Sequence, residues 1–215
     1  GSGKRMNNDV PKQFIVVNNF PLLYYTLKNL NSACPDAKII LVLPFIHIDL
    51  WKQLCVKYDI NIEHSIVEGG PERFHSVKNG LNAIKNYSDN TIVAIHDGVR
   101  PFVNKDIIDT GFLIAARKGS AVPAISIPDT LREVFGAYSK VVPRQKFCLI
   151  QTPQFFNFKQ LLDAYQISWS DTFTDDASVY ETSGRQITLI EGSKVNFKIT
   201  ENYDLIYAKA IIEQL

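Results

Sequence analysis

The sequence predicts an α/β fold in which helices cover both faces of a mostly parallel β-sheet. Short apolar runs rich in β-branched residues alternate with longer segments of helical apolar spacing through the first 127 residues. In addition, glycines and charged residues gather just after several of these runs, and ligands of such sheets bind beyond the carboxyl ends of the strands. The alternation therefore predicts both the fold class and the edge of the sheet that carries a site.

The earliest elements follow in order. Residues 22–30 have helical apolar spacing after Pro21. Residues 38–43 form an apolar run that ends at Pro44, as expected of a buried parallel strand. Residues 49–58 are expected to form a helix, and residues 62–67 a second strand that ends at a glycine pair.

A proline near the first turn then opens an expected helix at residues 71–87. Residues 91–95 form a third apolar run, which places His96 and Asp97 at its carboxyl end. Asn104 or Asp106 is suited to cap the next helix, which runs to Arg117 before Gly119. The remaining expected elements are strands at residues 121–127, 186–191 and 195–199 and helices at residues 157–169, 175–182 and 202–213.

The alternation breaks between residues 128 and 152, where apolar runs at residues 130–135 and 141–150 flank the turn at residues 136–140. This pattern predicts a long β-hairpin arm. Because an isolated hairpin is marginally stable in water, the arm either folds onto its own domain or clasps the arm of a second chain. We favour the second arrangement, a homodimer.

The length of 215 residues fits one domain, 1–215, with residues 128–152 as its arm. A central strand is expected before Gly1, because without it two neighbouring strands would expose their ladder groups. We therefore expect the native chain to begin upstream.

Composition limits the possible partners and the compartment. The formal net charge of +1 gives no global attraction to nucleic acid or membrane, so any anion site must be local. The three cysteines are widely spaced and match no metal-ligand or disulfide pattern. With no signal peptide or long apolar run, the sequence favours the cytoplasm.

The first fourteen residues are the strongest candidate for a local anion site. Gly1, Ser2 and Gly3 form a small-residue turn whose backbone can approach a ligand closely, and Arg5 and Lys12 are among the cations that follow. Such a turn suits a triphosphate, although the same residues also fit an expression leader followed by a solvated basic turn. A Walker A loop is excluded, because no Ser or Thr follows the Gly-Lys pair.

Two internal segments also suit a nucleotide. Gly70 and Ser76 lie where a glycine pair meets the start of a helix, which alone fits a simple strand-to-helix turn equally well. Asp97 at a strand end, three residues before Arg100, suits a magnesium nucleotide beside an anionic second substrate. The structural alternative is a buried Asp–Arg pair that steadies the turn, and His96 is expected to be structural.

Motifs in order along essentially the whole chain resemble the 2-C-methyl-D-erythritol 4-phosphate cytidylyltransferases. Gly98 and Val99 replace the family's usual Ala-Ala pair between its Asp and Arg. The motifs are GSGKRM and PKQF (residues 1–6 and 11–14), EGGPERFHS (68–76), HDGVRP (96–101), PDT (128–130), VPR (142–144), QTPQ (151–154), TDDAS (174–178) and NFKIT (196–200).

This resemblance implies a Rossmann-like three-layer α/β/α nucleotidyltransferase fold and transfer of CMP from CTP, with Mg²⁺, to a polyol phosphate. It implies that Gly1, Ser2, Gly3, Gly70, Ser76 and Asp97 bind the nucleotide, with Asp97 toward the metal. It further implies that Arg5, Lys12, Arg144 and Lys198 are catalytic, and that Arg100, Thr130, Arg144, Thr174 and Lys198 bind the second substrate. The family's arm places the equivalents of Thr130 and Arg144 over the neighbouring chain's site.

The sequence supports three other functions less well. A ribitol 5-phosphate cytidylyltransferase shares the nucleotide half of these motifs. A non-catalytic nucleotide-binding regulatory protein is disfavoured, because binding alone does not require cations at the reacting phosphorus. A dinucleotide oxidoreductase is poorly supported, because the sequence contains no Gly-x-Gly-x-x-Gly.

Overall fold

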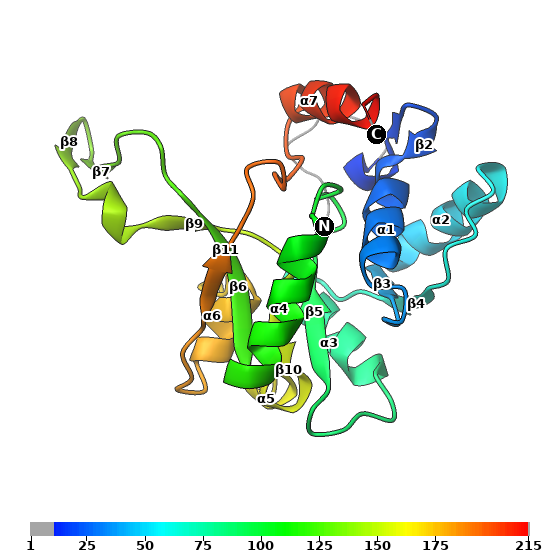
Figure 1. Cartoon of the computed structure of the whole chain (residues 1–215), viewed down its shortest axis with the longest axis horizontal. Coiled ribbons are helices and arrows are strands. Elements are labelled where there is room, and N and C mark those ends of the chain that lie inside the picture. The colour runs from blue at the N-terminus through cyan, green and yellow to red at the C-terminus, as the bar shows by residue number, and fades with distance from the viewer. Residues whose placement is uncertain (1–10, 215) are drawn as a thin grey trace.

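The computed structural model describes residues 11–214, in which helices and strands alternate (Figure 1). The helices are α1 (Leu22–Ala33), α2 (Phe45–Lys57), α3 (Arg73–Ala83), α4 (Lys105–Lys118), α5 (Phe158–Ala164), α6 (Asp176–Glu181) and α7 (Asn202–Ile212), with short 3₁₀ turns η1 (Lys12–Phe14) and η2 (Arg144–Lys146). The strands are β1 (Val16–Val17), β2 (Phe20–Pro21), β3 (Ile40–Leu43), β4 (Ser65–Glu68), β5 (Ile92–Ile95), β6 (Ser120–Ser126), β7 (Arg132–Phe135), β8 (Tyr138–Val141), β9 (Cys148–Ile150), β10 (Gln154–Asn157) and β11 (Leu189–Glu191).

The central sheet is mixed, so the prediction of a mostly parallel sheet was wrong. Its order is β11-β6-β10-β5, with β9 also paired to β6. The β11–β6 pair is parallel, but β10 is antiparallel to both of its neighbours and β9 is antiparallel to β6. The reason is topological: β6 leads into the arm, and the chain returns from the arm along β6 in the opposite direction. It then enters the sheet as β10, a strand that we did not predict.

Strands β3 and β4 form a separate parallel pair, in register from Ile40–Ser65 to Leu43–Glu68. Within residues 11–214, β3 pairs with β4 alone and β5 with β10 alone.

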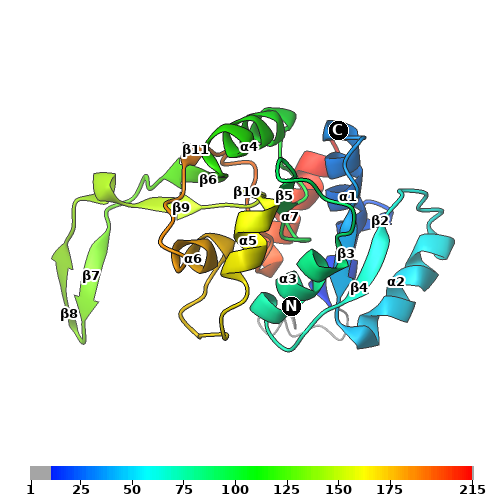
Figure 2. The same cartoon turned by 90° about the horizontal axis from the view of Figure 1, so that it is seen from below.

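Helices lie on both faces of the central sheet, as expected. Neighbouring residues of β10 show this directly, because consecutive side chains of a strand point to opposite faces. Phe155 packs with Ile107, Ile108 and other residues of the α4 side, whereas Phe156 packs in a second cluster with side chains of α3, α5 and α6. Figure 2 shows α4 on one side of β6 and β10 and α5 and α6 on the other.

Several local predictions are corrected. Residues 195–199 form no strand, although they were expected to, and residues 141–150 divide into the end of β8, the turn η2 and β9. Helix α2 begins at Phe45, four residues before the expected start, and α5 ends at Ala164 instead of Trp169. The α4 boundaries agree with the sequence: Asn104 Oδ1 accepts a hydrogen bond from the Ile107 amide, and Gly119 ends the helix with φ of 87°.

The arm projects from the body of the molecule, with β7 and β8 paired at its tip (Figure 1). Its apolar side chains are exposed within this single chain, including Val134 at 70% and Tyr138 at 82%. Among residues 11–214, no helix has the length and apolar character needed to span a membrane.

Candidate active site

A polar pocket of about 260 Å³ lies at the carboxyl end of β5. It is lined mainly by charged and polar side chains from distant parts of the chain. The lining residues are Arg73, Asp97, Arg100, Ile150, Gln151, Thr152, Gln154, Thr174, Asp175 and Lys198. Of the predicted site residues, the structure therefore brings Asp97, Arg100, Thr174 and Lys198 together.

Three cations surround the Asp97 carboxylate. Its Oδ2 lies 3.0 Å from Lys198 Nζ and 3.3 Å from Arg100 Nε, and its Oδ1 lies 3.8 Å from Arg73 Nε. Burial alone would raise the pKa of Asp97, but the charges of Lys198, Arg73 and Arg100 outweigh it and lower the pKa to about 2. Asp97 is therefore ionised throughout the physiological pH range. The Asp–Arg pair considered from the sequence does form, within a larger cationic cluster.

His96 and Thr152 hold the turn that presents Asp97. His96 Nε2 lies 2.9 Å from the Arg100 carbonyl oxygen and its Nδ1 lies 3.1 Å from Thr152 Oγ1, which also accepts a hydrogen bond from the Asp97 amide at 3.0 Å. Burial lowers the pKa of His96 to about 4, so the imidazole is neutral near pH 7. These contacts agree with the structural role expected for His96.

The loop that carries Lys198 is anchored by the buried Asn196. Its Nδ2 donates to the Thr152 carbonyl at 2.9 Å, and its carbonyl oxygen accepts from Arg100 Nη1 at 2.8 Å. Gln151 also binds this loop, because its Nε2 donates to the Ser193 carbonyl and its Oε1 accepts from the Ser193 amide. The irregular backbone at residues 195–199, expected to be a strand, is thus held by side chains.

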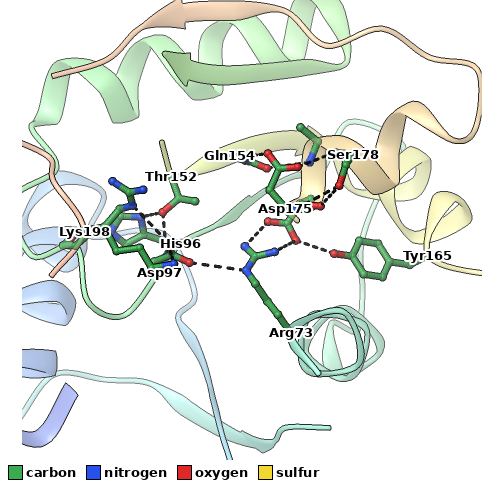
Figure 3. A network of polar contacts seen from close by, with 12 residues as sticks. Arg73, His96, Asp97, Thr152, Gln154, Tyr165, Asp175, Ser178 and Lys198 are labelled. Atoms are coloured by element: carbon green, nitrogen blue, oxygen red, sulfur yellow. Dashed lines mark hydrogen bonds and ion pairs between the residues drawn. The ribbon is translucent and has the colours of Figure 1, made fainter. Parts of the chain in front are cut away.

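Arg73 joins the pocket to the hydrophobic core (Figure 3). Its Nη1 and Nη2 donate to the two oxygens of Asp176 at 3.0 and 2.6 Å, and the Tyr165 hydroxyl donates to Asp176 Oδ1 at 2.7 Å. Asp176 is completely buried and Arg73 is the first residue of α3. One guanidinium therefore links α3, α6 and the Asp97 turn.

The start of α6 closes the pocket beside Thr174. Asp175 caps this helix by accepting from the Ser178 amide at 2.9 Å. The buried Gln154 of β10 donates to Asp175 Oδ2 at 2.8 Å and accepts from the Ala177 amide at 2.9 Å. Thr174, immediately before the cap, is exposed to the pocket.

The glycine loop lies between β4 and α3. Ser76 Oγ accepts from the Gly70 amide at 3.1 Å and also lies 3.3 Å from the Gly70 carbonyl oxygen. A Cβ at Gly70 would lie 2.3 Å from the His75 Cβ, so the loop has no room for a side chain there. Gly70 and Ser76 are not among the residues that line the pocket, but Arg73 lies between them in sequence and does line it.

Lys12 contacts the segment that follows Lys198. Its Nζ lies 3.5 Å from the Thr200 carbonyl oxygen, while Thr200 is itself held by Asp204. The structure thus brings Lys12 into contact with a residue that lies two positions after Lys198 in the sequence. Gly1, Ser2, Gly3 and Arg5 lie outside the described residues.

The two predicted arm residues lie away from this chain's pocket. Thr130 is exposed, and Arg144 donates a hydrogen bond from Nη1 to the Pro128 carbonyl at the base of the arm. Neither lines the pocket of its own chain.

Sequence reasoning gave no role to Arg73, Thr152, Gln154, Asp175 or Asp176, although all lie within motifs that it used. A signal was present for Asp175, because an Asp three residues before Ser is a helix-cap pattern. The partnership of Arg73 with Asp176 had no local signal, since the two residues are 103 positions apart.

An α/β fold whose pocket gathers three cationic side chains at the carboxyl end of β5 has the features of proteins that act on phosphorylated ligands. Comparison with known proteins makes this specific: the chain belongs to the IspD family, 2-C-methyl-D-erythritol 4-phosphate cytidylyltransferase, which it matches over residues 1–214. It is 42% identical over 212 residues to the Phocaeicola vulgatus enzyme of that name, covering 99% of this chain and 95% of the relative. It is 44% identical over 215 residues to the Azobacteroides pseudotrichonymphae enzyme, with the same coverage.

The fold agrees with solved structures of the same family. The crystal structure of 2-C-methyl-D-erythritol 4-phosphate cytidylyltransferase from Thermus thermophilus matches with a TM-score of 0.76 and 31% identity over 94% of each chain.

Proposed function

We propose that this protein transfers the cytidylyl group of CTP to 2-C-methyl-D-erythritol 4-phosphate and releases pyrophosphate, a step of non-mevalonate isoprenoid biosynthesis. Membership of the IspD family supports the reaction. The observation that links this reaction to particular residues is the contact of Asp97 with both Arg100 and Lys198 in one pocket. In such a pocket, cations can bind an anionic substrate while a carboxylate remains ionised between them.

The reaction forms one P–O bond and breaks another. A phosphate oxygen of the acceptor attacks the α-phosphorus of CTP, and the bond from that phosphorus to the bridging oxygen of the β-phosphate breaks, which releases pyrophosphate. Because a phosphomonoester has a second pKa of about 6, the attacking oxygen is already largely deprotonated near pH 7. The protein therefore needs to neutralise charge and align the two phosphates, and no side chain has to remove a proton.

The roles of the acceptor-binding residues are those that the family resemblance implies, and the shared pocket supports them. Arg100, Lys198 and Thr174 bind the acceptor phosphate, with Lys198 exposed enough, at 43%, to reach an incoming anion. Lys12 lies beside the Lys198 loop and, with Arg5, stabilises the negative charge that develops around the α-phosphorus.

The family resemblance assigns the cytidine to the glycine loop. In this structure Gly70 has no room for a side chain, and the Ser76 hydroxyl accepts a hydrogen bond from the Gly70 amide. A loop of this kind, with backbone and hydroxyl groups close together, supports that assignment. The family resemblance assigns the triphosphate to the backbone amides of Gly1, Ser2 and Gly3, which lie outside the described residues.

Asp97 is suited to share a magnesium ion with the nucleotide. Within residues 11–214, no three His, Cys, Asp or Glu residues cluster as a metal site of their own. A single carboxylate nevertheless fits Mg²⁺, which proteins usually bind through one or two carboxylates together with substrate phosphates. When bound there, the ion supplies positive charge to the triphosphate oxygens.

The complete site includes residues of a second chain. Thr130 and Arg144 lie on the arm, away from the pocket of their own chain, and the arm exposes Val134, Tyr138 and other apolar side chains. Two arms that clasp about a twofold axis bury these surfaces and bring Thr130 and Arg144 to the partner's acceptor site. The protein is accordingly a homodimer of single-domain chains.

The test is incubation of the protein with CTP, Mg²⁺ and each candidate acceptor, with release of pyrophosphate as the readout. We expect 2-C-methyl-D-erythritol 4-phosphate to support release and ribitol 5-phosphate to support little. Equal or faster release with ribitol 5-phosphate would contradict the proposed acceptor, and no release with either would contradict the reaction.

A further inference from the structure

Arg73 differs from the other cations around Asp97 in having a second, fully buried carboxylate as its partner. Lys198 and Arg100 both contact Asp97. Lys198 does so from the partly exposed loop at residues 195–199, and Arg100 from the turn that also carries Asp97. Arg73 directs its Nε toward Asp97 at 3.8 Å but commits both terminal nitrogens to Asp176. Asp176 has no exposed surface, whereas the Arg73 side chain that covers it is 36% exposed.

This arrangement makes movement of Arg73 unfavourable. If its guanidinium turned to bind a substrate phosphate, Asp176 would remain as a buried carboxylate with only the Tyr165 hydroxyl as donor. Burial and the charge of Asp176 both raise the pKa of Tyr165, so this phenol keeps the proton that it donates. The Arg73–Asp176–Tyr165 cluster is therefore a fixed support.

The cluster also joins three segments that the reaction uses. Arg73 begins α3 directly after the glycine loop, Asp176 begins α6 two residues after Thr174, and Asp97 follows β5. Figure 3 shows Arg73 between Asp97 on one side and Tyr165 on the other. A bidentate Arg–carboxylate pair fixes orientation as well as distance, which a lysine at the same position cannot do.

We propose that Arg73 is a positioning residue of the transfer reaction: held by Asp176 and Tyr165, it fixes the Asp97 carboxylate relative to the glycine loop and binds no substrate phosphate itself. The inference rests on the proposed function, because the residue that it positions belongs to that site. It also gives a role to Arg73, for which the sequence motifs had implied none, unlike Arg100 and Lys198 in the same pocket.

The kinetic test compares Arg73→Lys with Tyr165→Phe, a milder change that removes one hydrogen bond to Asp176. The matched control is Tyr180→Phe, which removes a buried tyrosine hydroxyl from the same core but one that contacts Gln160, at 2.5 Å, away from the pocket. The turnover rate kcat is expressed per CTP-binding site counted by calorimetry, so that a misfolded fraction does not lower it.

For Arg73→Lys we expect kcat to fall roughly 10- to 100-fold while KM for CTP and for the acceptor stays within about threefold, because misplacement of a reacting group impairs alignment more than binding. Tyr165→Phe should lower kcat roughly threefold to tenfold, and Tyr180→Phe should leave it within about twofold. A tenfold or larger rise in KM for either substrate with kcat retained would make Arg73 a substrate ligand and overturn the proposal. Wild-type kinetics in Arg73→Lys would overturn it as well.

A second measurement does not depend on turnover. Nitrogen NMR of labelled protein, assigned with Arg73→Lys, reports whether the two terminal nitrogens of Arg73 are held. We expect separate Nη signals in the free protein that keep their positions when CTP and then the acceptor are added. Averaged Nη signals in the free protein, or a large shift on addition of either substrate, would contradict the proposal. Failure of the wild-type protein to release pyrophosphate would contradict the proposed function, whereas these signals still decide whether Arg73 is locked.

Discussion

Lys198 Nζ lies 3.0 Å from Oδ2 of Asp97, and the two side chains differ in their access to solvent. The lysine side chain is 43% exposed and the aspartate side chain 13%. An incoming phosphate can therefore reach the ammonium group, while Oδ2 of the carboxylate stays paired with Arg100 at 3.3 Å and its Oδ1 lies 3.8 Å from Arg73 Nε. This asymmetry is what a site needs if one cation is to bind substrate and one anion is to remain ionised beside it.

The first prediction concerns this lysine. We expect Lys198→Ala to lower kcat/KM for the acceptor roughly 10²- to 10³-fold, the usual effect of removing one preorganised charged donor, with little change in CTP affinity. Lys194→Ala, which removes an exposed lysine four residues earlier in the same region, is the matched control and should stay within about twofold of wild type. Equal effects of the two substitutions on kcat/KM would remove Lys198 from the site.

The second prediction concerns Lys12, whose Nζ contacts the Thr200 carbonyl beside the Lys198 loop. We expect Lys12→Ala to bind CTP but to turn over roughly 10²- to 10³-fold more slowly, about 3–4 kcal/mol in activation free energy, because it loses a cation near the reacting phosphorus. The exposed Lys28 of α1 provides the control Lys28→Ala. A wild-type kcat in Lys12→Ala would show that this lysine serves the fold alone.

The third prediction concerns pH and the anchor of the Lys198 loop. Asp204 Oδ2 accepts hydrogen bonds from the amides of Thr200 and Glu201 at 2.7 and 2.9 Å and from the Thr200 hydroxyl at 3.1 Å. Burial acts to raise the pKa of Asp204, but these hydrogen bonds and the charge of Lys12 lower it below its ordinary value. A carboxyl group whose pKa is lower in the folded state stabilises the fold above its unfolded pKa, and this contribution is lost as the pH falls through the folded pKa.

We accordingly expect Asp204→Asn to lower the free energy of unfolding by about 1 kcal/mol at pH 7 and the difference from wild type to shrink below about pH 4. Urea unfolding across this pH range measures it. Asp49→Asn, at a carboxylate with 90% exposure, should change stability little at any pH. A difference for Asp204→Asn that stays constant from pH 7 to 3 would mean that charge is not the source of the stabilisation.

The elements that the sequence predicted well are those with a local signal. Asn104 and Gly119 mark the ends of α4, and the apolar runs that became β3, β5 and β6 carry clear β-branched patterns. Strand β10 was missed because its four residues follow a proline and bury Phe155 and Phe156 on opposite faces, so they show no alternation. Its antiparallel direction depends on the return of the chain from the arm, which no local pattern encodes.

For the site, too, the contacts that could be predicted are those between residues close in the sequence. Asp97 and Arg100 follow one strand and lie three residues apart, so their contact could be anticipated. Lys198 meets Asp97, and Asp176 meets Arg73, only through the folding of distant segments, and nothing in the spacing of single residues reports such pairs. The family motifs assigned Lys198 and Asp97 to the site, but they gave no role to Asp176 or Arg73.

The fourth prediction concerns the arm. If Thr130 and Arg144 serve the partner's site, an inactive Lys12→Ala chain mixed with an inactive Arg144→Ala chain should regain activity, because one site of the heterodimer then combines an intact Lys12 with an intact Arg144. A mixture of Lys12→Ala with a chain carrying both substitutions has no intact Lys12 and should stay inactive. Chains that exchange subunits without regaining activity, or a monomer in sedimentation at working concentration, would show that the arm does not complete a second site.

Phosphorus NMR of the wild-type protein with CTP, Mg²⁺ and 2-C-methyl-D-erythritol 4-phosphate tests the central assignment most directly, because it follows every phosphorus atom of the reaction. We predict that the phosphomonoester signal of the acceptor disappears as a diphosphate diester and free pyrophosphate appear in equal amounts. ATP in place of CTP should give far less product, since the glycine loop and Ser76 are assigned to the cytidine. An unchanged acceptor signal while CTP is hydrolysed to CMP, or equal reaction with ATP, would contradict cytidylyl transfer at this site.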